Sequence, residues 1–241
     1  MSIKAYASHL FRQWAKDDLE CVYSYLEPNK NIKLLDLGCA EGTLTKKFAD
    51  YCNAEEVVGI DGVKSRNLKG INIIQANLND EFPLPKNHFD VVISHYSFEH
   101  LYNPGLFISE IYRVLKKGGY CIIATDNLSC WPNILALIMG WQPFSTTDGV
   151  GSNAIGNPFA IHTRRHKGEK AFEKKYLKQG IFEHNKVMAY QMLIDSFTYF
   201  HFNIERIKGV GYFPLYGYFA KLMNKIDIRH SHFLIIKARK T

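Results

Sequence analysis

The feature that most constrains the fold is the stretch from residue 32 to 45, which reads IKLLDLGCAEGTLT. Its first part, Ile32–Leu37, is a short apolar run with polar neighbours, which is typical of a buried parallel strand. Gly38 and Gly42 predict a tight turn that a ligand can approach closely, because glycine has no Cβ. A helix is predicted to follow, with Thr43 as its N-cap. A strand, a glycine turn and a helix in this order indicate an α/β sheet with a ligand at the helix N-terminus.

The rest of the chain alternates between strand and helix patterns. Further strands are predicted at residues 56–61, 71–75, 89–94, 120–125, 203–210 and 232–238, and helices at residues 8–27, 131–139 and 186–200. Another helix is predicted to open at Asn103 or Pro104. Lys116 and Lys117 complement its last turn, and Gly118-Gly119 ends it. This alternation favours one α/β domain with a sheet at its centre.

Composition sets looser limits. The chain has 241 residues and a net charge of +7, which suits an anionic partner such as nucleic acid, a membrane surface or a phosphorylated substrate, or simply a solvated basic surface. Its five cysteines show no metal-ligand spacing and no disulfide framework, so no metal site is predicted and a reducing cytoplasm is expected. The sequence shows neither a signal peptide nor an apolar run long enough to span a membrane.

The run from Asp36 to Gly42 resembles the nucleotide-binding signature of class I S-adenosylmethionine-dependent methyltransferases, with Ala40 in place of the central glycine. A NAD-type fingerprint would need glycine at positions 40 and 43, where the chain has Ala40 and Thr43. Residues 111–125, IYRVLKKGGYCIIAT, are similar to the corresponding run in small-molecule methyltransferases of type 11. The resemblance covers about residues 32–126. It implies a three-layer sandwich around a seven-stranded, mostly parallel, Rossmann-like sheet, with the last strand antiparallel and an insertion after strand five.

The same resemblance divides the single domain into four parts. Residues 1–30 form an N-terminal helical cover, 31–126 the cofactor-binding core, 127–185 an insertion, and 186–241 a helix with the closing strands. The insertion is rich in loop-forming residues, and loops of this length in compact domains are usually functional. We expect it to be a lid over the acceptor site. The alternative is a loop that is disordered or that contacts another copy of the chain.

The resemblance also implies the residues that hold S-adenosylmethionine. Asp61 ends the second strand, 19 residues after Gly42, where an acidic residue accepts hydrogen bonds from ribose hydroxyls. Asn77 matches the residue that binds the adenine amine, and Leu78 packs against the adenine. The full set of expected cofactor residues is Asp36, Gly38, Ala40, Gly42, Asp61, Gly62, Asn77, Leu78, Ser94 and His95.

A hydroxyl acceptor usually needs a base close to its reacting oxygen, and histidine suits that role at neutral pH. The candidates are His95, His162, His166 and His184. His184 comes first, because the run FEHNKVMAY loosely resembles a Gly-His-x-Arg-x-Phe segment of methyltransferases associated with bacterial surface polysaccharides. His184 is therefore predicted to be the base or an acceptor contact, with His95 second.

The predicted function is S-adenosylmethionine-dependent O-methylation of a small molecule, a sugar or a lipid-linked glycan. An RNA methyltransferase and a catalytically silent methyltransferase-like protein remain alternatives. An oxidoreductase is disfavoured by Ala40 and Thr43. Strand four is followed by Ser94-His95-Tyr96-Ser97 instead of the Asn/Asp-Pro-Pro-aromatic run that clamps a flipped base, so no specific nucleic acid is expected. A weak membrane contact through residues 131–141 is left open.

Overall fold

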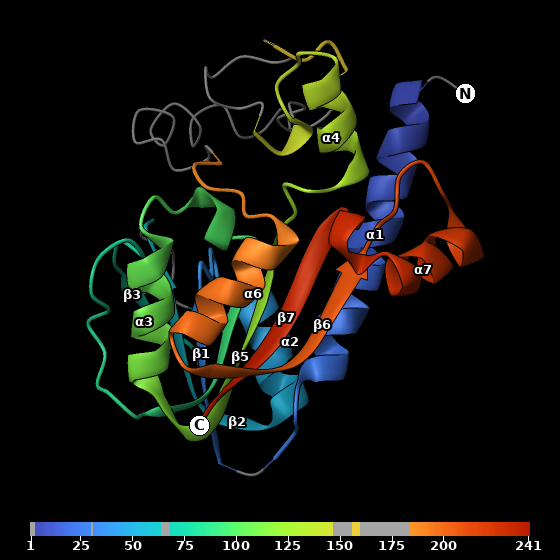
Figure 1. Cartoon of the computed structure of the whole chain (residues 1–241). Coiled ribbons are helices and arrows are strands. Elements are labelled where there is room, and N and C mark those ends of the chain that lie inside the picture. Colours follow the sequence, from blue (N-terminus) through green and yellow to red (C-terminus); the bar gives the residue numbers. More distant parts are fainter. Residues whose placement is uncertain (1–2, 30, 64–67, 147–155, 160–183) are drawn as a thin grey trace.

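The computed structural model describes residues 3–29, 31–63, 68–146, 156–159 and 184–241. A seven-stranded sheet forms its middle layer, in the order β3-β2-β1-β4-β5-β7-β6 (Figure 1). The strands are β1 (Ile32–Leu37), β2 (Ala54–Asp61), β3 (Asn72–Gln75), β4 (Phe89–His95), β5 (Leu115–Asp126), β6 (Phe202–Val210) and β7 (Phe233–Lys240). The first five pair in parallel, whereas β7 runs antiparallel to both β5 and β6. The predicted fold class is confirmed, including its antiparallel last strand.

Helices cover both faces of the sheet (Figure 1). The elements are α1 (Ile3–Tyr25), α2 (Thr43–Cys52), α3 (Pro104–Val114), α4 (Trp131–Ile138), α6 (Tyr190–Tyr199) and α7 (Gly217–Ile226). On one face, Trp14 of α1 and Phe48 of α2 share a buried apolar cluster with β1. On the other face, Phe107 of α3 and Phe197 of α6 share a second cluster with the sheet. These two cores make the three-layer sandwich.

The turn before α2 differs from its prediction. The N-cap is Gly42, with φ +82° and no side-chain cap, so the prediction of Thr43 as N-cap is wrong. The Gly42 N–H donates to the Cys39 carbonyl (2.8 Å), so the turn closes at Gly42, one residue before the predicted N-cap. The Thr43 hydroxyl donates to Glu41 instead (3.1 Å). A left-handed residue is needed at this corner, and glycine adopts that conformation without strain.

The end of α3 was also predicted wrongly. The helix stops at Val114, and Leu115 already pairs with Phe89 in the sheet. Residues 116–119 then bulge out before Tyr120 pairs with Val91, with Gly118 at φ +79°. Lys116 does not lie in the last helical turn, and its Nζ contacts both carboxylate oxygens of Asp90 (2.8 Å each). The Gly-Gly pair therefore shapes a strand bulge instead of a helix stop.

Part of the predicted insertion lies within the described residues. It contains α4 and a short 3₁₀ turn, η2 (Phe144–Thr146), and α4 lies beyond the carboxyl ends of the parallel strands (Figure 1). Residues 147–155 and 160–183, including the candidates His162 and His166, lie outside the described residues. The predicted lid therefore stays a prediction. Helix α6 begins at Tyr190 and not at the predicted Lys186. The backbone N–H groups of residues 185 and 186 donate to the Glu99 carbonyl, which ties this segment to the 3₁₀ turn η1 (Phe98–His100) instead of to a helix.

No helix within the described ranges is long and apolar enough to cross a membrane. The five cysteines are all free and buried.

Candidate active site

The glycine turn after β1 is joined to the end of β2 by backbone hydrogen bonds. The Gly38 N–H donates to the Ile60 carbonyl (2.7 Å). The Ala40 N–H donates to Oδ2 of Asp61 (2.8 Å), and the other carboxylate oxygen of Asp61 accepts from the Val63 N–H (2.9 Å). Ala40 itself has φ +48°, a left-handed conformation that is strained for alanine. The structure thus places the predicted residues Gly38, Ala40 and Asp61 at one corner of the sheet.

Gly38 allows the loop after β4 to approach this turn. Gly38 has φ +83°, and a Cβ built on it would lie 1.8 Å from Oγ and 2.6 Å from Cβ of Ser97. Ser97 is itself buried, so it has little room to move away. Gly59 of β2 plays a similar part, since its Cβ would lie 2.5 Å from the Cys39 sulfur. These close contacts were not predicted, because they join residues distant in sequence.

Asp36 is buried beneath the turn. Its Oδ2 accepts a hydrogen bond from the Thr45 hydroxyl of α2 (2.5 Å). Burial raises the pKa of Asp36 to about 6, although the bond from Thr45 opposes this shift. Asp36 therefore joins β1 to α2, and its predicted role in holding a cofactor stays a prediction.

The other predicted cofactor residues follow β2, β3 and β4. Asn77 is exposed, its Oδ1 accepts from the Asn79 N–H (3.1 Å) and its Nδ2 donates to Asp80 (3.0 Å). Leu78 is packed into the core, and Gly62 is exposed. Ser94 has no exposed surface, so its predicted cofactor contact has no accessible atom in this structure.

His95 is held by the N-terminal helix. Its Nε2 lies 2.6 Å from Oδ2 of Asp18, a fully buried residue of α1. The next residue, Tyr96, has φ +55°, and its N–H donates to the Ala124 carbonyl of β5 (2.9 Å). Asp18 was not singled out in the sequence. Because Asp18 engages Nε2, a catalytic role for His95 would fall to its other ring nitrogen, Nδ1.

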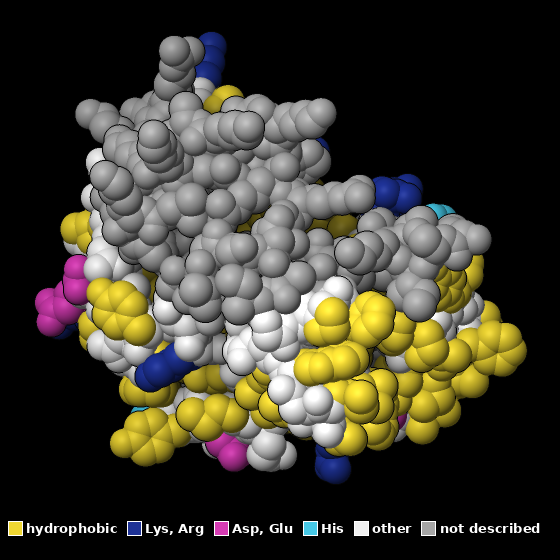
Figure 2. Space-filling view, turned by 90° about the horizontal axis from the view of Figure 1, so that it is seen from above, with side chains coloured by type: hydrophobic (Ala, Val, Ile, Leu, Met, Phe, Trp, Pro, Cys, Tyr) yellow, Lys and Arg dark blue, Asp and Glu magenta, His cyan; other side chains and the backbone are white. Residues whose placement is uncertain are grey.

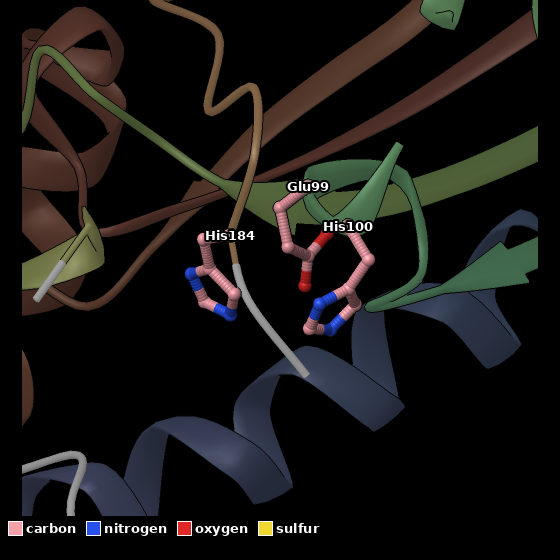
Figure 3. Close-up of side chains that lie close together, drawn as sticks. All are labelled: Glu99, His100 and His184. Carbon is pink, nitrogen blue, oxygen red and sulfur yellow. The ribbon is translucent and has the colours of Figure 1, made fainter. Parts of the chain in front are cut away.

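A second cluster lies where β4 and β5 end. Glu99 and His100 belong to a 3₁₀ turn, η1 (Phe98–His100), and His184 faces them from the start of the segment before α6 (Figure 3). Nδ1 of His184 lies 2.6 Å from the Ser145 carbonyl and 3.1 Å from Oδ2 of Asp126, the last residue of β5. The rings of His100 and His184 lie 4.8 Å apart, centre to centre.

Burial and charge shift both acid–base groups of this cluster. Burial raises the pKa of Glu99 to about 8, and the neighbouring Asp126 adds to this shift. Burial alone would lower the pKa of His184, but its hydrogen bond to Asp126 and the charges of Asp126 and Glu99 raise it to about 9. Without a metal ion nearby, His184 carries a proton at neutral pH. It therefore suits hydrogen-bond donation to an acceptor better than proton abstraction.

The structure brings together only some of the predicted catalytic residues. His184 lies in the second cluster, whereas His95 is held by Asp18. Sequence reasoning missed Glu99 and Asp126 as site residues. A signal was present, because both acids come directly at or after the carboxyl ends of adjacent parallel strands, where ligands bind in open α/β sheets.

The comparisons with known proteins agree with the fold. The fold is that of the Rossmann-like methyltransferases. Solved structures of similar fold include an S-adenosylmethionine-dependent methyltransferase from Mesorhizobium loti, with a TM-score of 0.58 and 16% identity over 92% of this chain and 96% of that one. Another is a putative S-adenosylmethionine-dependent methyltransferase from Listeria monocytogenes, with a TM-score of 0.56 and 15% identity over 98% and 99%.

Residues 35–123 match the family model described as a methyltransferase domain. Among the curated relatives, the ubiquinone biosynthesis O-methyltransferase of Pelagibacter ubique is 32% identical over 51% of this chain and 55% of its own length. A probable S-adenosylmethionine-dependent methyltransferase of Mycolicibacterium smegmatis is 36% identical over 39% and 38%. The chain thus spans about half the length, or less, of these relatives. Residues 35–123 are similar to a methyltransferase domain, and the Mycolicibacterium relative is described as a probable S-adenosylmethionine-dependent methyltransferase.

Proposed function

We propose that this protein transfers a methyl group from S-adenosylmethionine to a hydroxyl oxygen of a small acceptor. The observation that carries this proposal is the corner at which the Gly38–Gly42 turn meets Asp61, with the second cluster beyond the neighbouring strand ends. S-adenosylmethionine supplies a methyl group on a positively charged sulfur. Because such a displacement needs little covalent help, alignment of donor and acceptor is the main task of the protein.

The residues at the corner fit the donor. Asp61 is half-buried with two acceptor oxygens, which suits the two ribose hydroxyls. Ala40 is exposed beside it, so a ligand can reach the backbone of the turn. The amide oxygen of the exposed Asn77 accepts from the N–H and from Nδ2 of Asn79, and exchange of one of these bonds would let it accept from an adenine amine. Asp61 would then hold the ribose, and Asn77 the base.

The acceptor side is assigned to the second cluster. His184, which is mostly buried and keeps its Nδ1 on Asp126 and Ser145, would contact the acceptor oxygen. A hydroxyl acceptor is supported by the name of the Pelagibacter relative, an O-methyltransferase, although that relative matches only about half of the chain. A sugar or lipid-linked glycan stays among the predicted acceptors.

Titration calorimetry with S-adenosylmethionine and, separately, with NAD tests the donor. We expect binding of the first alone. Transfer of a radiolabelled methyl group into extract fractions of small molecules, lipids, glycans and RNA then tests the acceptor. Label in RNA, or no label in any fraction despite donor binding, would contradict the proposal and favour one of the two alternatives from the sequence.

Replacing Asp61 by alanine is expected to weaken S-adenosylmethionine binding by about 1–3 kcal/mol, because buried polar groups lose their partner. Calorimetric titration measures this change. Asp50→Ala is the matched control, since it removes an exposed carboxylate that pairs with Lys46 elsewhere on the surface. Equal affinities of the two variants would remove Asp61 from the donor site.

We further propose that α4 and α7 contact an anionic membrane surface. Both helices expose large apolar side chains: Leu135, Leu137 and Ile138 on α4, and Tyr218, Phe219, Leu222 and Ile226 on α7. Figure 2, which views the molecule from above, shows hydrophobic side chains gathered on the right of the view. Lys221 and Lys225 are interleaved with them on α7. Apolar and basic residues on one helix are typical of helices that lie in a lipid interface.

The two helices are joined through a hydrogen-bonded chain. Nε1 of Trp131, the first residue of α4, donates to the Tyr212 hydroxyl (2.6 Å), which donates to Asp227 at the end of α7 (2.5 Å). Both apolar surfaces therefore belong to one connected unit that could rest on the same lipid surface.

The combined variant Ile138→Ser, Phe219→Ser is expected to bind vesicles at least about tenfold more weakly, because each buried side chain of this size contributes about 1.5–3 kcal/mol. Co-sedimentation with vesicles containing phosphatidylglycerol measures this effect, and vesicles of phosphatidylcholine alone should bind the unmodified chain less. Tyr199→Ser, at an exposed aromatic of α6, is the control. If neither kind of vesicle binds the unmodified chain, α4 and α7 do not contact a membrane surface and the proposal is wrong.

A further inference from the structure

The second cluster contains a set of side chains that is suited to a metal ion. Glu99, His100 and His184 each offer one ligand atom, and these atoms lie within 4.8 Å of one another. Figure 3 shows the carboxylate of Glu99 between the two imidazole rings. Ligands of a tetrahedral zinc ion with bonds of about 2.0–2.1 Å lie about 3.3 Å apart. Side-chain shifts of about an ångström would therefore close the three atoms onto one cation.

The ring of His184 is oriented for ligation. Its Nδ1 lies 2.6 Å from the Ser145 carbonyl and 3.1 Å from the carboxylate of Asp126, and both are acceptors. Binding of a metal ion displaces the proton from Nε2, the nitrogen on the side of Glu99 and His100 (Figure 3), while the proton on Nδ1 stays hydrogen-bonded to these acceptors. Metal-binding histidines almost always donate their other ring N–H to a carboxylate or a carbonyl in this way.

The remaining two ligands are also held in place. Oε2 of Glu99 accepts from the Thr125 hydroxyl (2.9 Å), and only 1% of Glu99 is exposed. Asn185 connects the two ligand-bearing segments, because its N–H donates to the Glu99 carbonyl and its Nδ2 to the His100 carbonyl (2.8 Å each). The position of His184 relative to η1 is thus set by hydrogen bonds within the described residues.

We propose that Glu99, His100 and His184 bind a divalent transition-metal ion of the zinc type. Two imidazoles and one carboxylate favour such an ion over Mg²⁺ or Ca²⁺, which prefer oxygen ligands. Three protein ligands leave a coordination position open, as in catalytic zinc sites. This step rests on the proposed function: the acceptor hydroxyl would bind at the open position, so that His184 acts on it through the metal ion instead of by direct contact. A bound metal ion would make loss of the hydroxyl proton easier.

The test uses the whole chain without a histidine tag, freed of metal with EDTA and dialysed. Calorimetric titration with ZnCl₂, and metal analysis after gel filtration, should give one tightly bound Zn²⁺ per chain. MgCl₂ should bind far more weakly. Glu99→Gln and His184→Ala should each weaken zinc binding by at least tenfold, and Asp126→Asn by about 10–100-fold through its contact with His184.

The matched control is His201→Asn. His201 is exposed and has φ +63°, a conformation that asparagine tolerates, so this variant removes an imidazole without straining the backbone. It should bind zinc like the unmodified chain. Circular dichroism confirms that each variant is folded before titration.

Two results would overturn the metal site. One is the absence of stoichiometric zinc binding, and the other is unchanged affinity in Glu99→Gln and His184→Ala. Titration of the same metal-free preparation with S-adenosylmethionine keeps the two proposals apart. Donor binding without zinc binding rejects only the metal site, whereas zinc binding without donor binding rejects the proposed function.

Discussion

Replacing His184 by alanine is expected to lower kcat by about 10²–10⁴-fold, the range for loss of a group that handles a proton at the reacting atom. His184 is 2.6 Å from the Ser145 carbonyl and 3.1 Å from Asp126, so its ring has a fixed orientation beside Glu99. The measurement is single-turnover methyl transfer once an acceptor is in hand. Affinity for S-adenosylmethionine should not change, because His184 lies outside the corner assigned to the donor.

A second substitution separates two roles of His184. Glutamine can still donate a hydrogen bond near the place of Nε2 but cannot accept a proton at neutral pH. If His184 only contacts the acceptor, His184→Gln should recover part of the activity lost in His184→Ala. If His184 is the base, both variants should be equally slow. Near-normal turnover in His184→Ala would exclude both roles, and His201→Asn again serves as the control.

Replacing Gly38 by alanine is expected to destabilise the fold by about 2–5 kcal/mol. A left-handed conformation costs alanine roughly 1–2 kcal/mol, and overpacking adds about 1–3 kcal/mol. The overpacking arises because the new Cβ would lie 1.8 Å from Oγ of the buried Ser97. Urea unfolding followed by circular dichroism measures the change.

The difference between Gly38→Ala and Gly118→Ala isolates the steric part of this effect. Gly118 has φ +79°, close to the +83° of Gly38, but a Cβ there meets nothing within 4 Å. Gly118→Ala should therefore show only the backbone cost. The double variant Gly38→Ala, Ser97→Gly should recover most of the difference. Equal unfolding free energies for Gly38→Ala and Gly118→Ala would show that the loop after β4, with Ser97, moves away from the new Cβ at little cost in free energy.

Local patterns in the sequence were enough to predict the sheet. The apolar runs in β1, β2, β4 and β5 are short and bounded by turn residues, and each observed strand contains its predicted range, although β2 begins two residues and β5 five residues before it. The resemblance at residues 32–126 supplied the antiparallel last strand, which periodicity cannot supply. The ends of helices and strands were predicted less accurately. Gly42 replaced Thr43 as the N-cap, and Gly118 belongs to a bulge, because both depend on how the chain closes against its neighbours.

The functional residues divide in the same way. The turn from Gly38 to Gly42 and the acid at Asp61 could be found in the sequence, because their roles follow from spacing along a strand–turn–helix unit. The second cluster, with Glu99, His100 and His184, could not be found in the sequence. Cysteine spacing predicted no metal site, and His184 lies 84 residues from His100 along the chain.

The sequence by itself thus determined the class of sheet and the position of the turn assigned to the donor, since both follow from local apolar periodicity and from glycines at fixed offsets. The tertiary structure alone decided that Asp18 holds His95 and that Glu99, His100 and His184 meet. The physical reason is that parallel strands bring their carboxyl ends to one edge of the sheet. Side chains far apart in the chain become neighbours there, and no local pattern records which of them will touch.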